Sequence, residues 1–135
     1  AAHLHDIGKI GISDIILLKP AVLTEQEFKQ VRQHPIIGEY ILKPLGYLPR
    51  ERDIIRYHHE RLDGKGYPDG LQGEEIPFLS RILTVADSFD AMTTDRPYRK
   101  ALPVPEALKE LQRCTSQFDQ NIVAVFLDVI GQRLS

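Results

Sequence analysis

The sequence contains a single cysteine, Cys114, so neither an internal disulfide nor a zinc site built from thiolates is possible. Basic residues are not in excess: 17 Lys and Arg against 19 Asp and Glu give a formal net charge of −2, which argues against polymeric nucleic acid as a partner. No apolar run approaches the roughly 20 residues of a membrane span, and no segment resembles a secretion signal. We therefore expect a cytoplasmic protein with no membrane segment, in which an anionic ligand depends on local cations or bound metals.

The chain is 135 residues long, which suits one domain spanning 1–135 without an internal boundary. It begins with Ala1-Ala2-His3 rather than with a methionine, and we interpret these residues as lying inside a helix that starts earlier. We therefore expect the N-terminal portion of the domain to be missing.

The adjacent pair His5-Asp6 is the first feature that favours chemistry. An imidazole and a carboxylate on neighbouring residues can reach one cation, and a carboxylate can bridge two because it has two oxygens. This mixed donor set suits zinc, iron or manganese better than calcium. Lys9 follows Asp6 by three residues, so on a helix it shares that face and can meet phosphate oxygens. A single His-Asp pair is common and usually has no function, so the hypothesis depends on further ligands.

Apolar spacing and proline positions predict helices and no persuasive strand, so the predicted fold class is all-α. Residues 1–7 read as the end of a helix that stops near Gly8. Residues 8–23 read as an irregular connection, and we expect its apolar run, residues 15–18, to pack on the core. Further helices are predicted at 35–43, 49–59 and 80–94, from Pro105 onward, and after an N-cap at Asn121.

Two breaks in this pattern bear on function. Thr24 and Glu27 match a capping box for a helix through Arg32, and Pro35 then disfavours helical geometry at His34. We expect His34 to turn inward at this break. Residues 60–79 form a long loop rich in glycine and proline, and such a loop in a compact domain is more often functional than idle.

Candidate metal ligands occur in groups near the predicted helix ends and breaks. Taken singly, a histidine is more often a satisfied core residue than a ligand. Two adjacent imidazoles are harder to bury unless something occupies their nitrogens. The candidates are His5 and Asp6, His34, His58 and His59, and Asp87.

Asp87 lies in an otherwise apolar helix, where a carboxylate costs several kcal/mol unless it is paired or binds a metal. Asp90 shares that face by its three-residue spacing, and one of the two can instead point to solvent. We favour Asp87 as a ligand and Asp90 as a group that holds an imidazole or the substrate. Beyond this helix, Arg96, Arg99 and Lys100 fit an anion site, although without a metal nearby they would read as a solvated charge cluster.

With these residues identified, the sequence resembles the HD-GYP branch of the HD phosphohydrolase superfamily. The resemblance covers nearly the whole chain, and a match at this many ordered positions is more specific than any one motif. The matching segments are residues 5–9 (His-Asp-Ile-Gly-Lys), Lys19-Pro20, Leu23-Thr24, His34, residues 58–71 (His-His-Glu-Arg-Leu-Asp-Gly-Lys-Gly-Tyr-Pro-Asp-Gly-Leu), 73–77, 81–82, 85–91, 96–99 and 117–119.

The resemblance implies an HD-type helical bundle with a long loop between helices, and a cluster of two or three divalent metals, usually iron or manganese. It implies hydrolysis of cyclic di-GMP to the linear dinucleotide, and in some members on to GMP, in bacterial second-messenger signalling. An upstream sensor or receiver domain and GGDEF-domain cyclases are the implied partners. Carried over residue by residue, the metal ligands are His5, Asp6, His34, His58, His59 and Asp87; Asp6, which bridges metals, and Lys9 are catalytic; Lys9, Tyr67, Asp90, Arg96 and Arg99 contact the substrate.

The chain departs from the family chiefly by an absence. Family members carry a glutamate and a histidine on a helix upstream of the His-Asp pair, and both help to bind metal. We expect a chain without them to hold fewer metals, or to hold them loosely, and to expose apolar surface. Smaller departures are Ser13, Ala21 and Gln120, at loop or cap positions where stability rather than chemistry is at stake.

Three interpretations of function stay open at this point. The first is the cyclic di-GMP phosphodiesterase. The second is a catalytically inactive module that binds cyclic di-GMP or a protein partner, and the truncated chain can behave in this way even if its parent is active. The third is an HD hydrolase for another nucleotide, against which the Gly66-Tyr67-Pro68 loop weighs.

Overall fold

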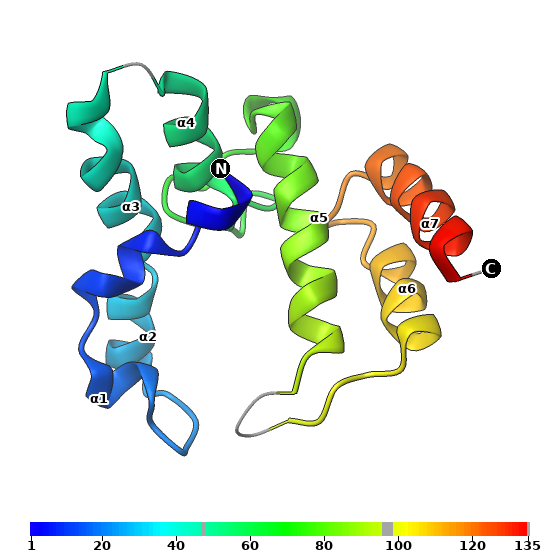
Figure 1. Cartoon of the computed structure of the whole chain (residues 1–135), viewed down its shortest axis with the longest axis horizontal. Helices are drawn as coiled ribbons and strands as arrows, with labels where there is room; N and C mark the ends of the chain where they lie inside the picture. The colour runs from blue at the N-terminus through cyan, green and yellow to red at the C-terminus, as the bar shows by residue number, and fades with distance from the viewer. Residues whose placement is uncertain (47, 96–98, 135) are drawn as a thin grey trace.

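The protein is all-α, as its apolar spacing predicts (Figure 1). The structure is a computed structural model and describes residues 1–46, 48–95 and 99–134. An isolated antiparallel bridge joins Asp63 and Gln72, and no longer strand is formed in the described ranges. The elements are η1 (Ala2–Leu4), η2 (Ile7–Gly11), α1 (Asp14–Leu17), α2 (Glu25–Val31), α3 (His34–Leu42), η3 (Lys43–Leu45), α4 (Pro49–Tyr57), η4 (Gly73–Glu75), α5 (Phe78–Thr93), α6 (Val104–Arg113) and α7 (Gln120–Leu134), where η denotes a short 3-10 helix.

The first 23 residues differ most from the sequence prediction. Instead of one helix ending near Gly8, the chain forms two 3-10 helices, and η2 continues through Gly8 to Gly11. The predicted irregular connection contains the one-turn helix α1. Its apolar run does not pack on the core as a whole: Ile16 is buried, whereas Ile15 and Leu18 are 82% and 76% exposed. A single helical turn buries only one of its faces, and this explains the difference.

The predicted break between α2 and α3 is present, but it lies at Arg32 and Gln33 rather than at His34, which is already the first residue of α3. Thr24 and Glu27 form the capping box: the Glu27 N–H donates to the Thr24 hydroxyl, and the Thr24 N–H donates to the Glu27 carboxylate. Helix α2 ends at Val31, and α3 begins at His34 with Pro35 in its first turn. The His34 side chain is buried. The predicted inward turn of His34 is therefore confirmed.

Two glycines bring the N-terminal segment against α3. A Cβ on Gly8 would lie 1.8 Å from the His34 carbonyl oxygen and 2.6 Å from the Gly38 nitrogen. A Cβ on Gly38 would lie 2.9 Å from the Ile55 side chain, on α4. Backbone therefore packs directly on backbone, and this close approach sets the position of the preceding residues, His5 and Asp6, relative to His34.

The second half of the chain builds its core around α5, whose far side packs against α6 and α7 (Figure 1). Val85, Leu111, Phe118 and Val123 form the buried apolar cluster. Helix α5 begins at Phe78, two residues before its predicted start. Helix α7 begins at Gln120, so Asn121 lies inside it and is not its N-cap; the Asn121 N–H donates instead to the Asp119 carboxylate.

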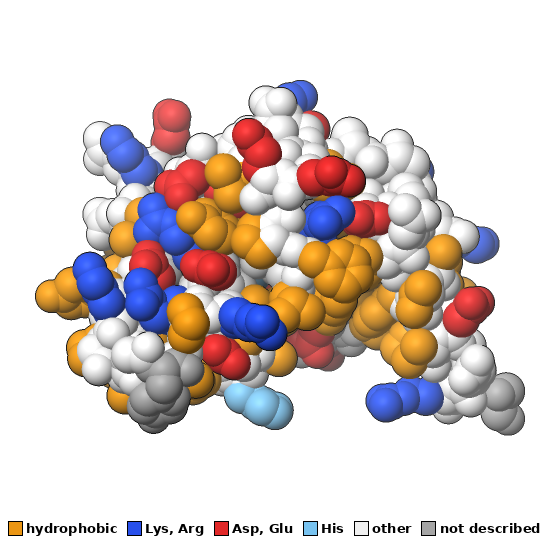
Figure 2. All heavy atoms as spheres, turned by 90° about the horizontal axis from the view of Figure 1, so that it is seen from above, with side chains coloured by type: hydrophobic (Ala, Val, Ile, Leu, Met, Phe, Trp, Pro, Cys, Tyr) orange, Lys and Arg blue, Asp and Glu red, His pale blue; other side chains and the backbone are white. Residues whose placement is uncertain are grey.

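The surface is mixed in character. Figure 2 shows Lys and Arg side chains interspersed with Asp and Glu over the face seen from above, in keeping with the small net charge. Apolar side chains lie between them in this view. Ile10 and Val22 are among the large apolar residues that are mostly exposed. Among the described residues, no helix combines the length and apolar character needed to cross a membrane.

Candidate metal centre

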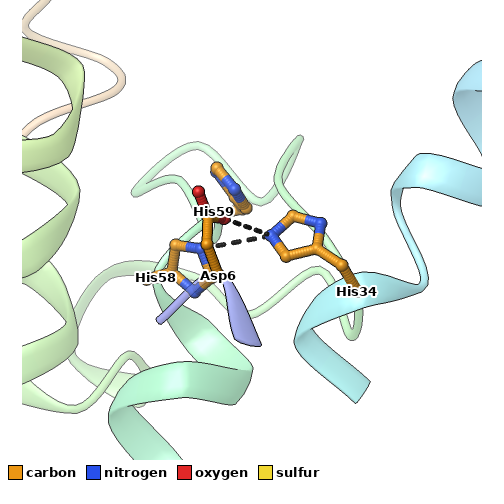
Figure 3. Close-up of side chains that lie close together, drawn as sticks. All are labelled: Asp6, His34, His58 and His59. Carbon is orange, nitrogen blue, oxygen red and sulfur yellow. Dashed lines mark hydrogen bonds and ion pairs between the residues drawn. The ribbon is translucent and has the colours of Figure 1, made fainter. Parts of the chain in front are cut away.

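Four of the predicted ligands converge on one point. Asp6, His34, His58 and His59 each offer a donor atom, and these atoms all lie within 4.8 Å of one another (Figure 3). They come from separate parts of the chain: Asp6 immediately precedes η2, His34 opens α3, and His58-His59 follow the last residue of α4. The Nε2 atom of His34 lies 3.4 Å from the Asp6 carboxylate and 3.4 Å from the His58 Nε2.

Backbone carbonyls orient three of the imidazoles in the same way. The Nδ1 atoms of His5, His34 and His58 lie 2.6, 2.7 and 2.6 Å from the carbonyl oxygens of the residues three positions earlier. A carbonyl oxygen only accepts, so each Nδ1 must carry the proton and donate it. In a neutral imidazole this leaves Nε2 with a free lone pair, the arrangement seen for metal-bound histidines.

The Nε2 atoms of His34 and His58 then present two lone pairs to each other across 3.4 Å. Burial keeps both rings neutral, because it lowers the pKa of His34 and lowers that of His58 to about 4. Burial likewise lowers the pKa of His59 to about 3. Two facing acceptors repel unless a cation lies between them. Donors about 2.1 Å from one ion at a tetrahedral angle are about 3.4 Å apart, so the cluster fits a divalent metal.

His5 and Asp87 extend this cluster on one side. The His5 Nε2 lies 3.3 Å from the Asp87 carboxylate and 3.5 Å from that of Asp6. The hydrogen bond with Asp87 raises the pKa of His5. Burial opposes ionisation of Asp87, yet its contact with His5 leaves its pKa lowered. All six predicted ligands are therefore contiguous, with the Asp6 carboxylate touching both His5 and His34.

Lys9 stands beside Asp6, as the three-residue spacing predicted. Its Nζ lies 2.5 Å from the Asp6 carboxylate. Burial opposes ionisation of Asp6, but the Lys9 ammonium outweighs it and lowers the pKa of Asp6. The Lys9 side chain is 41% exposed, so its ammonium remains in contact with solvent.

The Gly-Tyr-Pro loop covers another side of the cluster. The Tyr67 ring stacks on the His59 ring, with 4.8 Å between centroids, and the Tyr67 N–H donates to the His59 carbonyl. Gly66 permits this approach, because a Cβ there would lie 2.4 Å from the Arg61 nitrogen and 2.6 Å from the His59 oxygen. Burial raises the pKa of Tyr67, and the nearby charges of Asp87 and Asp6 add to that effect.

A buried carboxylate fixes the far end of this loop. Glu60 is 1% exposed and accepts three backbone N–H groups, from Asp69 and Gly70 on one oxygen and from Leu71 on the other. On the outside, Arg56 forms a bidentate pair with Asp69 and also contacts Glu39 on α3. The loop is thus held from both sides, and Tyr67 is kept against His59.

Asp90 and Arg99, also predicted as site residues, are not among the side chains that form the cluster. Asp90 is exposed, and in the described part of the chain its side chain pairs with no imidazole, so its role toward histidine finds no support. Arg99 is exposed and donates to the Ala91 carbonyl. Arg96 lies outside the described residues. Sequence reasoning missed Glu60, which it quoted only as part of a motif, and Arg32, which lies within cation–π distance of Tyr67.

Comparison with known proteins agrees with this geometry. The family model described as HD domain matches residues 1–122. The chain belongs to the HD domain family. It is 48% identical over 132 residues to a cyclic di-GMP phosphodiesterase of Thermotoga maritima, covering 94% of this chain and 35% of that protein. It is 49% identical over 113 residues to the cyclic di-GMP phosphodiesterase response regulator RpfG of Xanthomonas campestris pv. campestris, covering 82% and 30%.

Another relative is named for a different substrate. The chain is 48% identical over 108 residues to the 3'3'-cGAMP-specific phosphodiesterase 3 of Vibrio cholerae, covering 80% of this chain and 24% of that protein. Among solved structures, a cyclic GMP-AMP-specific phosphodiesterase of V. cholerae superposes with a TM-score of 0.69 at 21% identity, covering 95% and 36%. At this identity the likeness shows the fold alone, and it confirms the predicted HD-type helical fold.

The HD domain of this chain spans about a third of the length of the curated relatives that it matches. Family membership together with the His and Asp cluster indicates that the domain binds divalent metal.

Proposed function

We propose that this chain is the catalytic HD-GYP domain of a longer protein, with residues 1–135 forming one domain, and that it hydrolyses cyclic di-GMP to the linear dinucleotide. Two or three ions of iron or manganese are held by His5, Asp6, His34, His58, His59 and Asp87. The observation that carries the proposal is the meeting of these side chains beside Lys9 and the Gly-Tyr-Pro loop.

The donor set supports hydrolysis rather than a structural metal role. Divalent ions bound here would neutralise charge on phosphoryl oxygens and make water acidic enough to attack phosphorus near neutral pH. The protein contributes neutral imidazoles of fixed orientation, because their Nδ1 protons are already given to backbone carbonyls. It also contributes two carboxylates, Asp6 and Asp87, whose lowered pKa keeps them ionised as ligands.

Lys9 supplies the positive charge next to the reacting phosphate. Its ammonium is partly exposed, and within the described ranges its side-chain partner is the Asp6 carboxylate, so it can turn toward the phosphate oxygens of a substrate. Water attack on phosphorus breaks one P–O3′ bond of the cyclic dinucleotide and opens the ring. A second cleavage at the other phosphate would yield GMP.

The relatives favour cyclic dinucleotides as the substrate class. Those of T. maritima and X. campestris are named cyclic di-GMP phosphodiesterases. The V. cholerae relative named as specific for 3'3'-cGAMP makes that dinucleotide the second candidate substrate. In the parent protein we place an upstream sensor or receiver domain before this one, and GGDEF-domain cyclases as interaction partners.

The test is hydrolysis of cyclic di-GMP and of 3'3'-cGAMP with Mn²⁺ or anaerobic Fe²⁺, with the products separated by chromatography. We expect turnover by the wild-type chain and its loss, together with loss of metal, in His58→Ala and Asp87→Ala. His3→Ala is the matched control, because His3 is exposed and lies outside the cluster.

Two results would contradict the proposal. Binding of cyclic di-GMP without turnover by the metal-loaded chain would make it a binding module. Turnover by His58→Ala at the wild-type rate would place the chemistry elsewhere. If the chain hydrolyses 3'3'-cGAMP faster than cyclic di-GMP, then 3'3'-cGAMP is its preferred substrate and the choice of cyclic di-GMP is wrong.

A further inference from the structure

Arg32 occupies an unusual place beside the metal cluster. It lies two residues before the buried ligand His34, at the end of α2, and its side chain is exposed. The guanidinium carbon is 4.6 Å from the centre of the Phe28 ring and 5.2 Å from the centre of the Tyr67 ring. The guanidinium therefore lies within cation–π distance of two aromatic rings on different segments.

The polar edge of this guanidinium is unused. Among the described residues, no carboxylate forms an ion pair with Arg32 and no side-chain acceptor takes its N–H groups, in contrast to Arg52, Arg56, Arg61 and Arg81, each of which has a carboxylate partner. Stacking on aromatic faces fixes an arginine without engaging its donors. The result is an exposed guanidinium that lies beside two aromatic rings and whose donors have no side-chain partner among the described residues.

The position of Arg32 fits a base better than the reacting phosphate. Tyr67 stacks on the ligand His59, and Arg32 contacts Tyr67, so the guanidinium stands one ring outside the ligand cluster. The reacting phosphate must lie at the cluster itself, where Lys9 already provides a cation. The ribose and base of the same nucleotide extend outward from that phosphate.

We infer that Arg32 is a specificity-determining residue that binds the O6 and N7 acceptors of a guanine base of the substrate. This inference rests on the proposed function, since it concerns the same site. A guanidinium fork matches the two acceptors of guanine, whereas adenine offers a donor at N6 beside N7. Phe28 and Tyr67 hold the fork in place, and the aromatic surface beside it suits a purine.

The test compares wild type with Arg32→Ala and Arg32→Lys. The value of kcat/KM is measured for cyclic di-GMP and for bis(4-nitrophenyl) phosphate, a diester without a base. We expect Arg32→Ala to lower kcat/KM for cyclic di-GMP by roughly ten- to hundredfold, as for loss of a bidentate Arg–guanine pair. The baseless diester and the bound metal should be unaffected, and Arg32→Lys should not restore activity because it lacks the fork. Lys29→Ala, which removes an exposed charge from the same helix, is the matched control.

An equal loss on the baseless diester, or full rescue by lysine, would overturn the inference in favour of a general charge or phosphate contact. Unchanged kcat/KM for cyclic di-GMP would overturn it outright. If wild type does not hydrolyse cyclic di-GMP, the proposed function fails separately. Equilibrium binding of cyclic di-GMP and cyclic di-AMP then decides: a preference for guanine that disappears in Arg32→Ala supports the role of Arg32, and an unchanged preference refutes it.

Discussion

Replacing Gly8 by alanine should move the ligands His5 and Asp6 away from the ligand His34. Gly8 lies in η2, two residues after Asp6, and its α-carbon faces the first turn of α3. A Cβ there would lie 1.8 Å from the His34 oxygen, 2.8 Å from the His34 carbonyl carbon and 2.6 Å from the Gly38 nitrogen, where ordinary contact begins at 3.4 Å. All three atoms are backbone, so no rotamer change relieves the clash.

The size of the effect follows from this overlap. The segments must part by about 1.5 Å, which is a large fraction of the roughly 2.1 Å bond between a ligand atom and such an ion. Overpacking of this kind typically costs about 1–3 kcal/mol, and the immobile backbone places Gly8→Ala near the upper end. For a domain of this size we expect Tm to fall by roughly 10 °C.

Elemental analysis and thermal unfolding measure both consequences. We expect Gly8→Ala to retain its helical circular dichroism at low temperature but to bind substoichiometric metal. Gly131→Ala is the matched control: Gly131 lies in α7 with no atom within 4 Å of an added Cβ, so alanine there should leave metal unchanged and raise stability by about 0.4–1 kcal/mol. Wild-type metal content and Tm in Gly8→Ala would refute the close approach of η2 and α3.

Two further predictions concern the loop and the metal itself. Glu60→Gln puts an amide NH₂ opposite one of the backbone N–H groups that the carboxylate accepts. We expect the free energy of unfolding, measured by heat or urea, to fall by about 2–3 kcal/mol. Glu74→Gln, on the exposed η4, is the control and should change it little. An unchanged unfolding curve for Glu60→Gln would show that the loop is held in another way. Removing metal with a chelator leaves the facing lone pairs of His34 and His58 without a cation, so Tm should fall. Adding Mn²⁺ should restore Tm, because an ion at a hundredfold excess over its Kd adds about 2.7 kcal/mol to the free energy of unfolding. A Tm that is indifferent to chelator and metal would argue against a filled site.

Local signals allowed much of this architecture to be predicted from the sequence. The Thr24–Glu27 capping box, the break before Pro35 and the start of α4 at Pro49 each depend on nearby residues, and each is present. The chemistry of adjacent imidazoles singled out His58 and His59, and the family resemblance implied that His34 binds metal with them. Their cluster depends on long-range packing, but the ligands themselves carry a recognisable pattern.

The features that were missed depend on contacts between distant segments. The 3-10 helix η2 places Gly8 against the His34 carbonyl, a contact that no sequence spacing reports. Glu60 acts on backbone N–H groups of residues 69–71, so its partners have no side-chain signature. Arg32 reads as an ordinary surface arginine until Tyr67 is placed beside it.

The most direct test of the central claim is the metal content of the wild-type chain, measured by elemental analysis after loading with Mn²⁺ or anaerobic Fe²⁺ and removal of unbound ions, in the same samples that are assayed with cyclic di-GMP. We predict two or more ions per chain together with turnover. Less than one ion per chain and no turnover at saturating metal would contradict the assignment of this cluster as the catalytic centre of the domain.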